Sequence, residues 1–99
     1  MNLSKKFNDA KQYVTPQVFK MIKDNEIESW GIIHSELSYD EPKRATRALQ
    51  VQHKVQKAKN IDELWAVTPR FAREEVLQGI IEYTSEEKEH RLKNRVANM

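Results

Sequence analysis

Three prolines stand where helices are expected to begin, and only two glycines occur in the 99-residue chain. Pro16 and Pro69 each follow Val-Thr. Pro42 follows Ser38 and Asp40, two residues whose side chains can cap a helix. Proline is favoured in the first helical turn because the backbone N–H that it lacks would have no partner there. The many Lys, Glu, Gln, Arg and Ala residues also favour helix, whereas a β architecture would need more turn residues. The sequence therefore predicts an all-α protein.

Apolar residues recur at steps of three and four along most of the chain, which is the spacing of one helix face. Residues 27–37 have this spacing but contain Gly31 and follow Asp24, so they fit either one bent helix with the preceding segment or a second short helix. A short strand over residues 30–34 is a weaker alternative. We expect a small single-domain bundle of five or six helices, with helices over residues 3–13, from 16 onward, 41–59, 61–67, 70–83 and 86–99.

Several aromatic and aliphatic residues are candidates for the core. Trp30 and Trp65 lie within helical apolar patterns, so we expect both to be buried rather than to stack on a ligand. The helix over residues 70–83 is expected to direct its inner face through Phe71 or Ala72, Val76, Ile80 and Tyr83.

The triplet Val-Thr-Pro occurs at residues 14–16 and again at 67–69. The residues that follow the two copies share almost nothing, so the triplets do not mark an internal repeat. Thr-Pro is also a target of proline-directed kinases, but a capping or buried hydroxyl explains the residue choice more simply. We interpret both triplets as helix starts.

The last fifteen residues form a charged segment of their own. Thr84 and Glu87 have capping-box spacing, which predicts a new helix start. The apolar residues of this segment make a thin stripe of Leu92, Val96 and Met99. We therefore expect a compact domain over residues 1–84 and a C-terminal helix over 85–99 that either packs loosely or joins two chains as a homodimer.

The middle of the sequence holds a concentrated positive charge. Between Lys43 and Lys59 there are six Lys or Arg residues and no acidic residue, although the net charge of the whole chain is only +2. On a helix, four of these cations and Gln50 fall on one side, which we call the basic ridge: Lys43, Arg47, Gln50, Lys54 and Lys57. Ala48, Val51, Val55 and Ala58 gather on another side and can anchor the helix.

Long cations near every turn suit the neutralisation of successive phosphates. We expect the basic ridge, helped by Arg44, to contact RNA or DNA with little sequence preference, and Gln50 and His53 to add hydrogen bonds. Charged helix faces often remain simply solvated, which is the alternative to a binding role. An acidic protein surface is the second candidate partner. Membrane binding fits poorly, since the apolar side of this helix is small and has no aromatic residue.

The sequence offers little support for catalysis. His34, His53 and His90 are far apart and lack metal-ligand spacing, and no glycine-rich phosphate loop is present. There is no cysteine, and the longest apolar run has only four residues, Leu64 to Val67. We expect a cytoplasmic protein without metal, cofactor or enzymatic activity.

Two functional hypotheses follow. The first is a non-catalytic binding protein that uses the basic ridge on nucleic-acid phosphates. The second is a protein-binding regulator or inhibitor, such as the short accessory proteins of phages and mobile elements, that acts through the basic ridge or through the C-terminal helix.

Overall fold

A computed structural model describes residues 2–97 of the chain, with side chains for residues 2–95. Within that range the protein consists of helices and contains no strand, so the all-α prediction is confirmed. There are five α-helices and one 3-10 turn: α1 (Leu3–Lys11), α2 (Pro16–Leu37), α3 (Pro42–Lys57), α4 (Ile61–Val67), η1 (Arg70–Ala72) and α5 (Arg73–Ala97).

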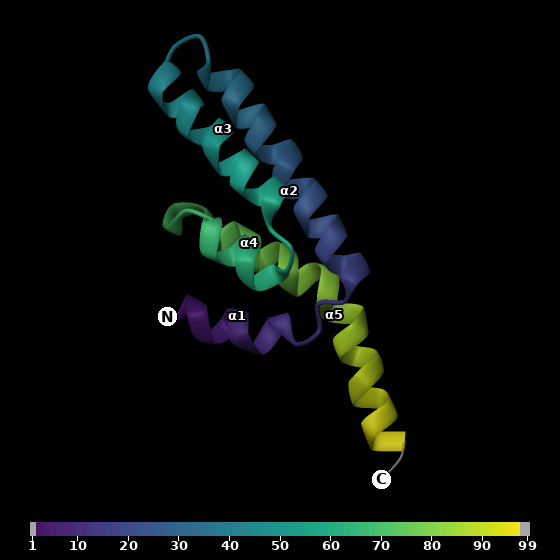
Figure 1. Cartoon of the computed structure of the whole chain (residues 1–99). Coiled ribbons are helices and arrows are strands. Elements are labelled where there is room, and N and C mark those ends of the chain that lie inside the picture. The colour runs from purple at the N-terminus through teal and green to yellow at the C-terminus, as the bar shows by residue number, and fades with distance from the viewer. Residues whose placement is uncertain (1, 98–99) are drawn as a thin grey trace.

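Helices α2 and α3 form a long antiparallel pair joined by a short turn (Figure 1). The first half of α5 packs against α1 and α2, and α4 lies between α3 and α1. The last turns of α5 project beyond the other helices, at the lower end of Figure 1. The resulting molecule is elongated, with extents of 59 × 28 × 19 Å.

Local capping explains where three of the helices begin. The side chain of Asn2 accepts hydrogen bonds from the backbone N–H groups of Ser4 and Lys5 at the start of α1. Thr15 Oγ1 accepts from Val18 N at 3.2 Å, so the first Val-Thr-Pro triplet is a helix start as predicted. Asn60 caps α4 in the same way, through a 2.8 Å bond from Glu63 N.

The second Val-Thr-Pro triplet has a different role, so this prediction was wrong. Helix α4 ends at Val67, and Thr68 follows as its C-cap. The Thr68 side chain is buried and its hydroxyl donates to the carbonyl oxygen of Leu64 at 2.7 Å. The hydroxyl is therefore bonded back to the preceding helix and does not cap the next one, and Pro69 leads into η1 rather than directly into an α-helix.

Helix α2 is continuous, so the alternatives of a break near Asp24 and of a strand over residues 30–34 are both wrong. Asp24 instead forms an ion pair with Lys20, one turn earlier, with Lys20 Nζ 3.4 Å from Asp24 Oδ2. Gly31 lies within the continuous helix, and the Gln52 side chain of α3 lies against it.

Helix α5 is also continuous through the predicted boundary at residue 85. Thr84 is buried and donates to the carbonyl oxygen of Ile80 at 2.7 Å, and Ser85 donates to Glu82 O at 3.0 Å. Hydroxyls that bond back one turn are compatible with a helix interior, so Thr84 and Glu87 do not form a capping box. The division into parts 1–84 and 85–99 stays a prediction, but both parts now share one helix.

The core lies where α1, α4 and α5 meet α2 and α3. Phe7 stacks on Trp65 with ring centroids 4.3 Å apart and an interplanar angle of 4°. Trp30 and Trp65 are both buried, as predicted, and Val76 and Ile80 form the inner face of α5. Of the two alternatives Phe71 and Ala72, Ala72 packs against the core and Phe71 is 82% exposed. Tyr83 was wrongly predicted to lie on the inner face, since it is 39% exposed.

Candidate functional site

Helix α3 places the basic segment on an exposed edge of the molecule (Figure 1). Its N-cap residue, Glu41, makes no side-chain capping bond. The Glu41 carboxylate instead pairs with Arg44 at 2.9 Å, and Thr46 Oγ1 donates to the carbonyl oxygen of Pro42. The helix ends two residues earlier than predicted, so Lys59 lies just beyond it.

Helix α3 is docked on α2 through its smallest side chains. Ala45 and Ala48 are buried, as are Val55 within the helix and Ala58 at its C-cap, and Val51 is half-buried. The apolar side predicted from helical spacing is therefore the docked side. Ala45 adds to it, although the sequence did not single that residue out.

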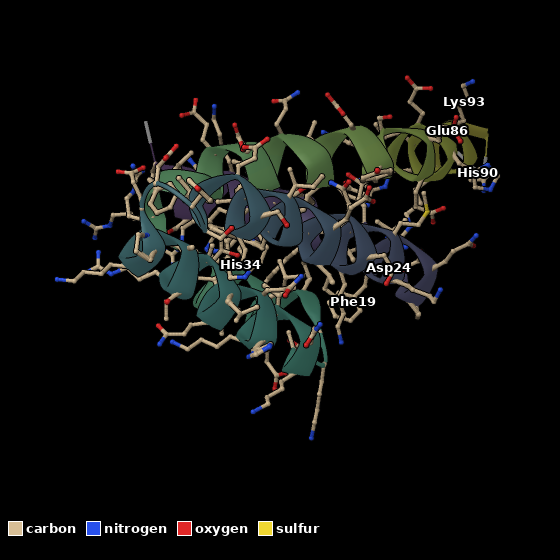
Figure 2. The ribbon with its side chains drawn as sticks, turned by 90° about the horizontal axis from the view of Figure 1, so that it is seen from above. Phe19, Asp24, His34, Glu86, His90 and Lys93 are labelled. Carbon is tan, nitrogen blue, oxygen red and sulfur yellow. The ribbon has the colours of Figure 1, made fainter. Side chains whose placement is uncertain are left out.

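Three polar side chains connect the same two helices at intervals along their length. They all bond to backbone carbonyl oxygens of the facing helix or its cap: Lys23 Nζ donates to Ala58 O at 2.8 Å, Gln52 Nε2 donates to Ile27 O at 2.8 Å, and Nδ1 of His34 lies 2.9 Å from Ala45 O. Figure 2 shows His34 between the two ribbons. Three contacts spaced along the pair fix the rotation of α3 about its own axis.

Gly31 makes one of these contacts possible. A Cβ atom built on Gly31 would lie 2.9 Å from Nε2 of Gln52, closer than real Cβ contacts allow. The missing side chain thus leaves room for the Gln52 amide to reach the α2 backbone. Gly31 serves the approach of α3 rather than a bend in α2.

With α3 held in this rotation, all five members of the basic ridge are exposed to solvent. Arg44 is exposed as well and is engaged by Glu41. Among the residues whose side chains are described, no ion pair joins Lys43, Arg47, Lys54 or Lys57 to a carboxylate. The positive charge of the ridge is therefore directed outward and is not neutralised by the side chains that the structure describes.

A groove of about 490 Å³ runs alongside the basic ridge. Its apolar lining comes mainly from α2 and from the segment after α4, and includes Trp30, Ile33 and Phe71. Its polar rim comes from α3 through Arg44, Arg47, Gln50 and Lys54. The described lining contains no carboxylate, so the groove combines an apolar floor with a cationic edge. We refer to it as the α2–α3 groove.

Phe71 stands at one wall of this groove in an unusual position for a phenylalanine. It is 82% exposed, although burying a Phe side chain typically stabilises a fold by about 1.5–3 kcal/mol. Its backbone is held in η1, where Ala72 N donates to Pro69 O at 3.0 Å. Its ring meets Trp30 edge to face, with centroids 6.1 Å apart and an interplanar angle of 73°. Phe71 is thus supported by the buried Trp30 while most of its surface stays in solvent.

Behind the groove, Glu26 is a partly buried carboxylate on α2. Burial raises the pKa of Glu26, a hydrogen-bonding interaction with Trp30 lowers it, and the charge of Glu75 raises it again. The Trp30 indole N–H is itself buried and has no hydrogen bond of good geometry. Its interaction with Glu26 therefore offsets little of the cost of burying the carboxylate. The net effect is a raised pKa, which reflects an uncompensated charge next to the core.

The remaining predicted site residues are not brought together. His53 is exposed on α3, and Nε2 of His90 lies 3.2 Å from Nδ2 of Asn94. Figure 2 shows His90, Glu86 and Lys93 on the far end of α5, away from His34. Leu92 is 45% exposed and lines a separate hollow between α1 and α5. The Val96 side chain and Met99 lie outside the described residues.

Two aromatic side chains near the ridge were not anticipated as functional. Phe71 was considered only as an alternative to Ala72 on the inner face of its helix, and Tyr39, at 94% exposure in the turn between α2 and α3, was not considered. Phe71 lies two residues after Pro69, and Tyr39 lies in the turn that follows α2. Their closeness to a proline or a turn is the only sequence signal that distinguished them from core aromatics.

Comparisons with protein-family models, with curated proteins and with solved structures found no match to this chain. In the described part of the molecule, His, Asp and Glu side chains nowhere form a group of three or more suited to a metal ion. None of its described helices combines the length and the apolar character needed to cross a bilayer.

Proposed function

We propose that this protein is a non-catalytic, cytoplasmic nucleic-acid-binding protein of the helical-bundle type that contacts phosphates through the basic ridge with little sequence preference. One observation carries the proposal. Helix α3 is fixed on α2 so that Lys43, Arg47, Lys54 and Lys57 are exposed, and none of them forms an ion pair with a carboxylate of residues 2–95. A ridge committed to neutralising the protein's own carboxylates would be paired with them.

The dimensions of the ridge suit a polyanion. From Lys43 to Lys57 the helix rises by about 21 Å at 1.5 Å per residue. One strand of a nucleic acid places a phosphate about every 3.4 Å along a duplex axis, so this length faces several phosphates. Within the described part of the chain these cations have no ion pair to break on binding. Each phosphate contact gains free energy by releasing condensed counterions.

A salt titration tests the proposal. If four ridge cations each neutralise one phosphate, the slope of log affinity against log salt is about −3.6 for duplex DNA and about −2.8 for a single strand. Lys54→Glu and Lys57→Glu should each weaken binding to all sequences alike and reduce the slope by about 1. Lys5→Glu is the matched control, because it changes the net charge equally from an exposed position on α1. Absence of binding at low salt, or equal loss in the control, would contradict the proposal.

The second candidate function is a protein-binding regulator or inhibitor that uses the end of α5, with homodimerisation as one form. It is favoured by the apolar residues Ile81 and Leu92, which are exposed along α5 and line the hollow beside α1. Light scattering of the full chain and of a chain lacking residues 85–99 tests the dimer. A monomer mass for both would exclude it.

A further inference from the structure

We propose that the α2–α3 groove holds an unpaired base, so that the preferred ligand is a single-stranded nucleic acid whose phosphates lie on the basic ridge. This inference rests on the proposed function and specifies the class of nucleic acid. Three observations support the inference: the position of Phe71, the residues that line the groove, and the location of the groove beside the basic ridge.

Phe71 provides a flat aromatic surface in solvent. The residue is 82% exposed and its ring meets edge to face the ring of Trp30, which is only 4% exposed and belongs to the core. The ring therefore contacts the core through Trp30 while most of the residue is open to a ligand. Bases of any sequence stack on such rings, because every base has a π face.

The groove has the chemistry expected of a site for one nucleotide. A volume of about 490 Å³ lies within the range of pockets that take small ligands, about 300–1,000 Å³. Trp30, Ile33 and Phe71 supply an apolar floor, whereas Arg47 and Lys54 stand at the rim. An occupant that complements both parts is flat and apolar on one side and anionic on the other, which describes a nucleotide.

The same two cations belong to the groove rim and to the basic ridge. Arg47 and Lys54 line the groove, and Lys43 and Lys57 continue the ridge beyond it in both directions along α3. A strand that follows the ridge therefore passes the mouth of the groove. A base can turn into the groove only if it is not paired, so a duplex would make the phosphate contacts alone.

Tyr39 extends the pattern at the N-terminal end of α3. It is 94% exposed in the turn between α2 and α3, four residues before Lys43 and two residues after Leu37, which lines the groove. Aromatic side chains beside a basic track are the combination that single-strand-binding proteins use. Tyr39 is thus placed to stack a second base.

An acidic segment of another protein is the competing occupant, because its side chains would also meet the cationic rim. The exposed aromatic surfaces favour the nucleic acid, since carboxylates gain nothing from the faces of Phe71 and Tyr39. The negative quadrupole on an aromatic face disfavours an anion placed over it.

The test compares three labelled probes of equal length by fluorescence anisotropy at low salt: single-stranded oligo-dT, an abasic single strand and a duplex. The abasic strand keeps the phosphates and removes the bases. The native protein should bind oligo-dT more tightly than the abasic strand by about 5- to 150-fold, the range of one stacked base. Phe71→Ala should lower oligo-dT affinity toward the abasic value and leave abasic binding unchanged.

Matched variants separate stacking from other effects. Phe71→Tyr retains the ring and should keep the preference for bases, whereas Phe71→Leu retains apolar area and should lose it. Tyr83→Ala removes an exposed aromatic residue of α5 outside the groove and should have no effect. Because Phe71 is exposed, its variants should unfold at nearly the native temperature, which a thermal melt verifies.

Three results would overturn the inference in different ways. Equal affinity for oligo-dT and the abasic strand, with loss of both in Lys54→Glu, would leave the phosphate-binding function intact and eliminate base stacking. Tighter binding to duplex than to oligo-dT would do the same. Failure to bind any of the three probes, together with displacement of a groove-bound dye by poly-glutamate, would remove both proposals in favour of an acidic protein partner.

Discussion

Helix α3 and the last turns of α5 are both densely charged, but they arrange their charges differently. Every charged residue from Lys43 to Lys59 is a cation, and only Arg44 is engaged in an ion pair among the described residues. The end of α5 mixes both signs, and Arg91 pairs with Glu87 at 2.8 Å. A helix of mixed sign can satisfy its charges locally, whereas a helix of one sign directs its field toward other molecules.

The two helices also differ in how they are attached. Helix α3 is docked along its length by buried alanines, Val55 and contacts to backbone carbonyls. The end of α5 is attached by surface contacts to the turn after α1: Arg91 donates to Gln12 O at 3.1 Å and lies 5.4 Å from the Tyr13 ring centroid. Core packing therefore fixes the orientation of the cations on α3, whereas only surface contacts fix the position of the α5 end.

The largest expected effect contrasts the two halves of α5. Ile80 is fully buried, so Ile80→Ala should lower the free energy of unfolding by about 2–5 kcal/mol. Leu92 is 45% exposed, so Leu92→Ala should change it by no more than about 0.5 kcal/mol. Urea unfolding measures both. A large loss in Leu92→Ala would show that the end of α5 is docked as firmly as the rest.

A second change attacks the docking of α3. Ala48 is buried against α2, so Ala48→Leu should force the helices apart and cost about 1–3 kcal/mol. Gln50→Leu, on the exposed side of the same helix, is the control and should be nearly neutral. Circular dichroism melts would show the difference, and an unchanged melting temperature in Ala48→Leu would contradict the close packing.

These contrasts indicate which features local sequence signals can predict. The cap at Thr15 and the two sides of α3 depend on residues within a few positions of one another, and each was predicted correctly. Thr68 was misassigned because its hydroxyl can bond either backward or forward, and burial against the core decides which. The preceding helix supplied the acceptor.

Features that depend on distant partners were not predictable. The contact between Gln52 and the backbone of Ile27 joins residues 25 positions apart and requires Gly31 on the facing helix. Phe71 looked like a core residue because helical spacing was extended through it, whereas a 3-10 turn rotates it outward. The α2–α3 groove is therefore a product of tertiary packing and left no motif in the sequence.

A third prediction concerns the polar contacts themselves. Gln52→Leu removes a part-buried donor to Ile27 O and should cost about 0.5–1.5 kcal/mol at any salt concentration. Arg91→Ala removes exposed charged contacts and should cost less than about 1 kcal/mol. The Arg91 loss should shrink in 1 M NaCl, where the screening length is about 3 Å. Equal salt sensitivity of the two variants would contradict the contrast between a docked and a surface attachment.

The smallest expected effect concerns Glu26, a partly buried carboxylate of α2. Its pKa is raised in the folded state, so the native protein binds more protons than the unfolded chain between the unfolded and the folded pKa. The free energy of unfolding therefore falls as pH rises through that window, and the loss persists at neutral pH.

Glu26→Gln removes the charge and should raise the melting temperature by a few degrees at most at neutral pH. At a pH well below the usual Glu range the increase should be smaller. Glu28→Gln, at an exposed neighbour on α2, is the control for the Glu-to-Gln substitution itself. Equal stabilisation at both pH values would mean that the Gln side chain acts through packing or hydrogen bonding and not through relief of the buried charge.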